Sequence, residues 1–188
     1  MSELVSPLNN ASFDGLVKIE EIGPLGMITL RGDLASHDMT HALSGVTGAA
    51  LPQTRRASVD GDRAVLWMSP DELLVLCPYA DVTGAVDTLG QALAGSHSLV
   101  ANVSDARAVF RLTGGNIREV LAKISPADLS PEGLPVGEVK RTRFAQVAAA
   151  FWLTSEEEAT VICFRSVADY TFALLKTAAH PDSAVGYF

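Results

Sequence analysis

Apolar and polar residues follow one another along the chain with two periods, one typical of strands and one typical of helices. Strand-type runs are predicted at 16–22, 27–31, 55–59, 63–68, 73–77, 98–103, 108–113 and 160–164, with a strand pair between 137 and 153. Apolar residues recur at helical spacing at 34–46, 81–94, 117–124 and 167–178. This mixture predicts an α+β fold, with mixed or antiparallel sheets and flanking helices.

Residues with special backbone preferences mark several element ends. Ser36 or Asp33 can cap the first helix, and Asp81 can cap the second. A hairpin turn with Gly61 is predicted over 59–62. Pro126 ends the third helix because its ring cannot continue a helical ladder.

The same order of landmarks occurs twice along the chain. In each half a glycine opens a helix, and a tryptophan, a glutamate-bearing turn, a strand ending in cysteine and an amphipathic helix follow. The landmarks are Gly32, Trp67, Cys77, Gly114, Trp152 and Cys163. This order favours an internally duplicated fold, with chance similarity of two α+β segments as the alternative. We predict an extended or partly disordered arm at 1–15, αβ repeats at 16–103 and 104–179, and a tail at 180–188, in one compact unit.

Composition and charge restrict the environment and the classes of partner. The chain has 188 residues and a formal net charge of −8, which argues against nucleic acid or an anionic membrane as a partner. Neither a bilayer-spanning stretch nor a signal-peptide pattern is present, so a cytoplasmic protein is expected. Cys77 and Cys163 are expected to be buried free thiols. At least one of Trp67 and Trp152 is expected to be largely buried.

Candidate chemical groups are sparse in the sequence. His37 and His41 have the spacing of two metal ligands on one helix face, but no third ligand is evident, so a solvated face is favoured. Gly114 and Gly115 precede a helix without a phosphate-binding fingerprint, which favours a simple turn. No nucleophile, base and oxyanion donor come together. We therefore predict no catalytic, cofactor-binding or metal-binding residues in this chain.

A local excess of basic residues occurs within this acidic chain, at Arg107, Arg111, Lys140, Arg141 and Arg143. Arg141 and Arg143 are two positions apart on a predicted strand, so both should lie on one face of it. They could face solvent, meet acidic residues of a partner, or hold a small anion. Arg141 and Arg143 are therefore the candidate residues of a partner interface.

Several short motifs follow one another in a distinctive order. The stretch 66–76 reads Leu-Trp-Met-Ser-Pro-Asp-Glu-Leu-Leu-Val-Leu, and further motifs occur at 103–105, 109–114, 120–123, 128–131, 134–137, 141–143 and 164–170. Together they resemble the gamma subunit family of heterotetrameric sarcosine oxidase, over roughly 15–179. That family is similar in turn to the folate-binding domain of the glycine-cleavage aminomethyltransferases, an internally duplicated α+β fold.

The resemblance implies an accessory or structural subunit of a bacterial enzyme that oxidatively demethylates sarcosine to glycine. It implies alpha, beta and delta subunits as partners, which hold FAD, FMN, NAD and tetrahydrofolate. No cofactor and no activity are expected of this chain alone, which could self-associate when isolated. The alternative is a stand-alone folate-binding or aminomethyltransferase-like protein. Two features count against it: the chain stops where an aminomethyltransferase would continue into a barrel domain, and 137–141 lacks the Lys-Gly-Cys motif of related iron–sulfur-cluster folate proteins.

Overall fold

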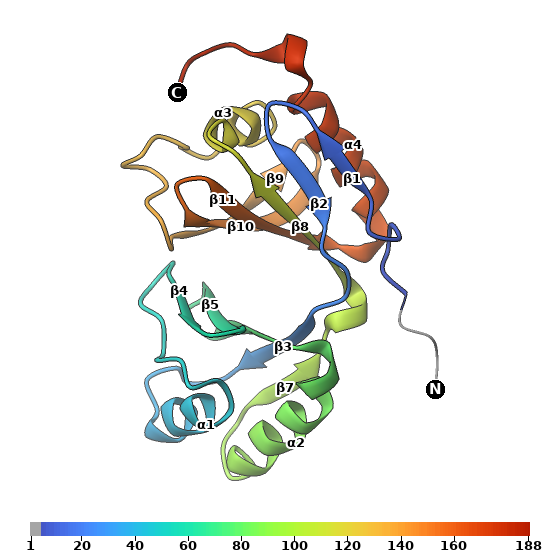
Figure 1. Cartoon of the computed structure of the whole chain (residues 1–188). Helices are drawn as coiled ribbons and strands as arrows, with labels where there is room; N and C mark the ends of the chain where they lie inside the picture. Colours follow the sequence, from blue (N-terminus) through green and yellow to red (C-terminus); the bar gives the residue numbers. More distant parts are fainter. Residues whose placement is uncertain (1–4) are drawn as a thin grey trace. The chain divides into compact units, whose positions relative to one another are not determined.

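Alternating apolar residues build two sheets, each with one face covered by helices (Figure 1). The structure is a computed structural model that describes residues 5–188. Within this range, unit 1 takes the segment that ends at Pro24 together with Asp105–Phe188, and unit 2 is Leu25–Ser104. The strand pairs of both units are antiparallel. The predicted α+β class with flanking helices is therefore confirmed.

Unit 1 is a sheet with the strand order β1-β2-β8-β11-β10-β9. Its strands are β1 (Ser12–Asp14), β2 (Lys18–Glu21), β8 (Arg107–Thr113), β9 (Val139–Phe144), β10 (Val147–Ser155) and β11 (Glu158–Phe164). Its helices are α3 (Ile117–Ala122) and α4 (Ala168–Ala178).

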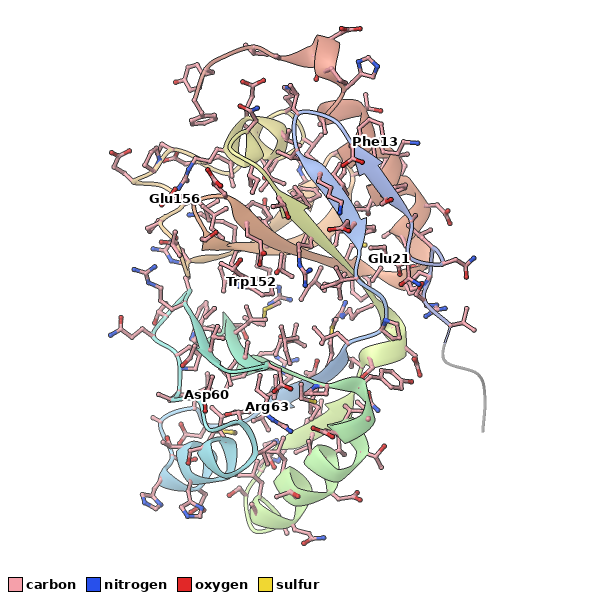
Figure 2. All side chains as sticks on the ribbon, viewed as in Figure 1. Phe13, Glu21, Asp60, Arg63, Trp152 and Glu156 are labelled. Carbon is pink, nitrogen blue, oxygen red and sulfur yellow. The ribbon has the colours of Figure 1, made fainter. Side chains whose placement is uncertain are left out.

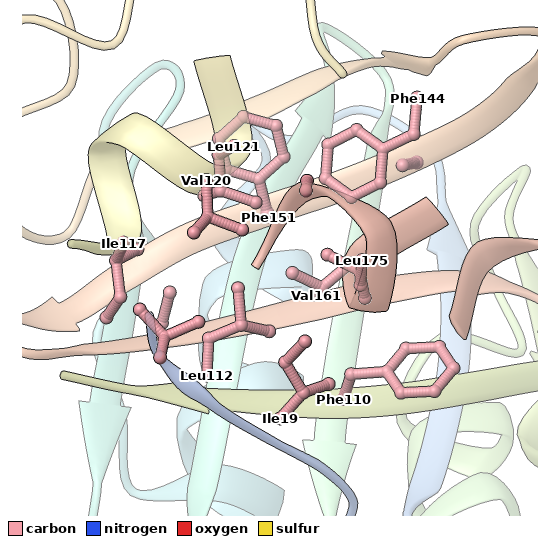
Figure 3. Packing of buried hydrophobic residues seen from close by; sticks show 14 of the residues in the cluster. Ile19, Phe110, Leu112, Ile117, Val120, Leu121, Phe144, Phe151, Val161 and Leu175 are labelled. Carbon is pink, nitrogen blue, oxygen red and sulfur yellow. The ribbon is translucent and has the colours of Figure 1, made fainter. Parts of the chain in front are cut away.

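The helices of unit 1 close a core over one face of this sheet (Figure 3). Phe110, Phe144 and Phe151 are fully buried there. The ring centroids of Phe144 and Phe151 lie 5.4 Å apart, a separation at which aromatic pairs stabilise a core. Val120 of α3 and Leu175 of α4 reach the same cluster from the helix side. The predicted helix stripes therefore meet the alternating face of the strands.

Unit 2 is built on the same plan, with the strand order β4-β5-β6-β3-β7. Its elements are β3 (Gly26–Arg31), α1 (His37–Thr47), β4 (Ala57–Asp60), β5 (Arg63–Ser69), β6 (Glu72–Cys77), α2 (Val82–Ala92) and β7 (Leu99–Asn102). Leu30 of β3 and Val75 of β6 pack with Met39 of α1 and Leu89 of α2. Gly61, at a φ of 58°, makes the predicted turn between β4 and β5.

The two strand orders correspond when strands are matched by position, β4-β5-β6-β3-β7 with β9-β10-β11-β8-β2. β2 is the strand before β3 in the chain but pairs with β8, and β7 is the strand before β8 but pairs with β3. The strand directly before β3–β6 in the chain therefore belongs to the sheet of unit 1, and the strand directly before β8–β11 belongs to the sheet of unit 2. For this reason the compact units divide the chain differently from the repeats at 16–103 and 104–179. The duplication and its boundaries stay predictions, which a superposition of the two units would test.

The predicted helix starts agree with the structure at one cap and differ at another. The Ser36 side chain accepts a hydrogen bond from the Met39 N–H at 3.2 Å, so Ser36 rather than Asp33 caps α1. Asp81 stands before α2, but within residues 5–188 its side chain caps no helix N–H. Its carboxylate instead accepts from the Arg63 guanidinium at 2.5 Å. The prediction that Asp81 caps α2 is wrong because this ion pair holds the side chain elsewhere.

Other expectations concern the arm and the core. Residues 1–4 of the predicted extended or partly disordered arm lie outside the described residues, and Ser12–Asp14 within the arm is an extended strand, β1, beside β2. Trp152 is 4% exposed and Trp67 is half-buried, which confirms that at least one tryptophan is largely buried. Cys77 and Cys163 are buried free thiols, also as predicted. Burial raises the pKa of both thiols.

Candidate functional site

Arg141 and Arg143 lie on β9, at one end of the strand order of unit 1. Arg141 is opposite Ala150 of β10, and Arg143 is opposite Ala148. Both arginines are exposed. The structure therefore confirms that they share one face of an edge strand, where an exposed guanidinium can pair with a carboxylate through two parallel hydrogen bonds.

The other residues of the basic excess noted in the sequence are separated from this pair. Arg107 and Arg111 lie on β8, and β11 and β10 stand between β8 and β9. The Arg107 guanidinium lies 4.1 Å from the centroid of the Phe164 ring, a cation–π contact. Lys140 points to the opposite face of β9 and pairs with Glu138 at 2.8 Å. Arg141 and Arg143 are therefore the pair that the fold brings together.

His37 and His41 stack on the exposed side of α1, with ring centroids 6.2 Å apart. Among residues 5–188, no group of three or more His, Cys, Asp or Glu side chains could hold a metal ion. The pair therefore has the geometry of two neighbouring surface side chains, in line with the solvated face favoured from the sequence.

Arg118 of α3 is a buried charge that the sequence did not single out. Its side chain is only 10% exposed. Its Nη1 donates to the carbonyls of Leu129, Ser130 and Leu134 at 3.1, 3.2 and 2.9 Å. Its Nη2 pairs at 2.9 Å with Glu156 of the β10–β11 turn, a residue that is labelled in Figure 2. The planar guanidinium therefore holds the loop after α3 in place by satisfying carbonyls that have no strand partner.

Glu119, the next residue of α3, binds the C-terminal tail. Its Oε1 accepts from the Val185 N–H and its Oε2 from the Gly186 N–H, both at 2.8 Å. Lys123, one helical turn away, lies 3.1 Å from Oε1. The backbone hydrogen bonds from Val185 and Gly186, with the contribution of Lys123, lower the pKa of Glu119 to about 2. Glu119 is therefore charged in the folded protein and fixes the tail to the helix.

Glu21 of β2 binds the N-terminal segment in a similar way (Figure 2). It is 3% exposed. Its Oε2 accepts from the Ser6 hydroxyl at 2.8 Å and from the N–H groups of Leu8 and Asn10 at 3.3 and 2.9 Å. Asn10 has a φ of 59°, a left-handed conformation that asparagine tolerates better than most residues. One buried carboxylate thus organises the turn before β1.

The sequence pattern did not single out Arg118 and Glu119, for a physical reason. Both stand between apolar positions of the predicted 117–124 helix, where side chains normally face solvent. In the folded chain the loop 125–137 and the tail cover that face, so the charges are buried with their partners. The i,i+4 spacing of Glu119 and Lys123 was the signal available from the sequence.

A depression of about 210 Å³ lies between α1 and α2. Gly45 and Gly84 line it together with Arg63 and Asp81. Ligand pockets usually have volumes of about 300–1,000 Å³. The Arg63 donors are already used by Asp81 at 2.5 Å and by the Val46 carbonyl at 3.3 Å. The depression therefore has the properties of a gap between packed helices rather than of a binding site.

A family model matches most of the chain. The model, described as "Sarcosine oxidase, gamma subunit family", matches residues 31–181. The chain belongs to this family. A sarcosine oxidase subunit gamma from Arthrobacter sp is 31% identical over 82% of this chain and 75% of its own length. Another, from Corynebacterium sp. (strain P-1), is 30% identical over 89% of this chain and 82% of its own length.

Two solved structures have folds similar to that of this chain. A chain of the heterotetrameric sarcosine oxidase from Corynebacterium sp. U-96, in complex with pyrrole 2-carboxylate, matches with a TM-score of 0.83 and 27% identity. The match covers 98% of both chains. Glycine cleavage system aminomethyltransferase T from Bartonella henselae matches with a TM-score of 0.61 and 13% identity, over 92% of this chain and 57% of that one. The second match concerns the fold alone, and it confirms the expected likeness to the aminomethyltransferase fold.

The segment matched by the gamma family model contains the candidate arginines but not every anchored segment. Arg141, Arg143 and Glu119 lie within 31–181, whereas β1, β2 and residues 182–188 lie outside it. The hydrogen bonds of Glu119 therefore connect the matched segment to the tail beyond it. In the part of the chain that the structure describes, no helix is long and apolar enough to cross a membrane.

Proposed function

We propose that this gamma-family chain works as an accessory subunit of a heterotetrameric oxidase that demethylates sarcosine to glycine. The observation that carries the proposal is the structural match to a chain of such a heterotetramer, with a TM-score of 0.83 over 98% of both chains. Because the match spans both lengths, it supports a role for this chain in the same kind of assembly.

The proposed partners are the alpha, beta and delta subunits, and the proposed cellular compartment is the cytoplasm of a bacterium. FAD, FMN, NAD and tetrahydrofolate are proposed to be held by those other subunits. This chain is proposed to hold no cofactor and to be non-catalytic. In support, the buried charges Arg118 and Glu119 are engaged by backbone groups of the chain itself.

A stand-alone folate-binding or aminomethyltransferase-like protein is not favoured. The aminomethyltransferase match, at 13% identity, concerns the fold alone. The depression between α1 and α2 is smaller than a usual ligand site, and its arginine is already paired.

The exposed pair Arg141 and Arg143 is proposed as a polar part of the partner interface. Both guanidinium groups lie on one face of the edge strand β9, in a chain whose net charge is −8. A basic patch in an acidic chain favours an acidic partner surface, and arginine is the residue best suited to bidentate pairing with carboxylates.

Co-expression with the other oxidase subunits tests the proposed function. The chain should co-elute with them on gel filtration, and the oxidase purified without it should lose activity or thermal stability. Separate elution, together with full activity and stability of the remaining subunits, would show that the chain is not part of the oxidase.

The arginine pair is tested by the double variant Arg141→Ala/Arg143→Ala. We expect weaker association with the other subunits and a smaller dependence of that association on salt, because two paired charges are removed. The matched control is Arg141→Lys/Arg143→Lys, which keeps the charge and loses the bidentate geometry, and it should fall between the wild type and the alanine variant. Unchanged association of the alanine variant would remove these residues from the interface.

A further inference from the structure

The end of the C-terminal tail is held through its backbone N–H groups. Both oxygens of the Glu119 carboxylate accept N–H groups of the tail, from Val185 and Gly186. Before this point Lys123 Nζ donates to the Ser183 hydroxyl and to the Ala178 carbonyl, both at 3.0 Å. The path of the tail from α4 to Gly186 is therefore fixed at successive positions (Figure 1, red).

At the end of the tail, the side chains of Val185, Tyr187 and Phe188 are apolar and exposed. The exposed fractions are 72% for Val185, 81% for Tyr187 and 46% for Phe188. Gly186 has a φ of 70°, a conformation that is unfavourable for residues other than glycine. The chain turns at this residue, which also supplies the second N–H bound by Glu119. The rings of Tyr187 and Phe188 then meet edge to face, with centroids 5.0 Å apart. An apolar side chain that packed on its own unit would lose this exposure.

We propose that residues 185–188 are a docking segment that inserts the Tyr187–Phe188 pair into an apolar pocket of another subunit of the oxidase. The inference rests on the proposed function, because that assembly supplies the partner. A tyrosine and a phenylalanine are rigid side chains with large apolar area, and aromatic residues are typical anchors of interfaces.

The Glu119 clamp explains why a short segment can serve this purpose. A free tail loses backbone freedom when it binds, and that loss weakens association. Here two hydrogen bonds to a buried carboxylate order the backbone before any partner arrives. The side chains of residues 183–188 carry no charge, so no charged side chain would be desolvated on insertion. These features favour an apolar pocket on a folded subunit over an acidic or basic peptide as the partner surface.

The double variant Tyr187→Ser/Phe188→Ser tests the docking segment in the co-expressed complex. We expect its affinity for the other subunits to fall by roughly 30-fold or more, as for truncated interface anchors, with an unchanged melting temperature of the isolated chain. The matched control is Tyr170→Ser, which removes an aromatic ring that is 44% exposed on α4. It should leave the affinity unchanged.

The outcomes separate this inference from the proposed function. If the wild type does not assemble with the oxidase subunits, the proposed function fails. If the wild type assembles and the double variant binds within twofold of it, only the docking segment is refuted. If the substitutions instead abolish a homodimer that the isolated wild-type chain forms, and leave assembly with the oxidase subunits intact, the tail binds a second copy. In that case the inference is also refuted.

Glu119→Gln tests the positioning role of the clamp separately. Glutamine keeps the size of the side chain, but only one of its two terminal atoms can accept an N–H. Hydrogen exchange of the C-terminal peptide should become faster in this variant, and its affinity for the other subunits should fall between those of the wild type and the double variant. Unchanged exchange at Val185 and Gly186 would show that Glu119 does not order the tail.

Discussion

The two units share a strand order but differ in how they hold the segments outside their sheets. Among the described residues, the buried charged side chains Glu21, Arg118 and Glu119 all belong to unit 1. The buried polar residues of unit 2 are the uncharged Thr47 and Ser104. Unit 1 contains the N-terminal segment, the loop after α3 and the C-terminal tail, and backbone groups of each of these segments bind one of the buried charges. A buried charged side chain makes several hydrogen bonds at once, so it can bind backbone groups that are not paired in a sheet where the chain is irregular.

Unit 2 is held together by apolar packing and weaker polar contacts. Ser104 accepts from the Met27 N–H at 2.9 Å, which joins the end of the unit to β3 through a neutral hydrogen bond. Arg63 is 26% exposed in its side chain, and it pairs with Asp81, whose side chain is 46% exposed. Such partly solvated ion pairs contribute little to folding stability. The comparison therefore predicts that equivalent substitutions are costlier in unit 1.

The largest expected difference is between Arg118 and Arg63. Arg118→Met leaves buried carbonyls of Leu129 and Leu134 without the guanidinium donor, and we expect it to lower the free energy of unfolding by about 3–5 kcal/mol. Arg63→Met removes one carbonyl contact and a partly exposed ion pair, and it should cost about 1 kcal/mol. Urea denaturation of both variants measures the two values. Equal losses would contradict the view that unit 1 depends more on its charges.

The second difference concerns the two tryptophans, which hold corresponding places in the repeated order of the sequence. Trp152 of β10 is 4% exposed, so Trp152→Ala should cost roughly 3–5 kcal/mol. Trp67 of β5 is half-buried at the edge of the unit 2 core, and Trp67→Ala should cost less than that. Thermal unfolding of the two variants orders them. A larger loss at Trp67 would mean that the half-buried ring carries contacts that its exposure does not reveal.

The regular part of both units could be predicted from the sequence, because local chemistry determines it. The Gly61 turn and the Ser36 cap require nothing beyond their neighbours in the chain. The face shared by Arg141 and Arg143 follows from the two-residue period of a strand.

The remaining features depend on contacts between distant residues. β2 belongs to the sheet of unit 1, although its pattern alone fits either sheet. Asp81 is of a residue type that commonly caps helices, but its carboxylate instead binds the guanidinium of Arg63, which lies 18 residues before it. Glu119 meets Val185 across 66 positions of sequence. No periodicity in a helix of this length predicts which loop will cover its polar face.

The smallest expected difference is in the pH dependence of two carboxylates. The backbone N–H groups of Val185 and Gly186 hold the folded-state pKa of Glu119 at about 2, below its ordinary value of 4.5. A lowered pKa means that the charged form is favoured in the folded state. The stability contributed by Glu119 is therefore fully present above pH 4.5, and it is lost as the pH falls from 4.5 towards 2.

Melting temperatures measured between pH 6 and pH 3 should accordingly converge for the wild type and Glu119→Gln, with the largest gap at the higher pH. Asp71 of unit 2 is the matched control. The Ser69 hydroxyl and then Arg31 lower its pKa, but its side chain is 57% exposed. Solvent screens such a group, so Asp71→Asn should give a gap smaller than that of Glu119→Gln across the same range. A gap at Glu119 that does not narrow on acidification would show that the tail is held by something other than the charge of this carboxylate.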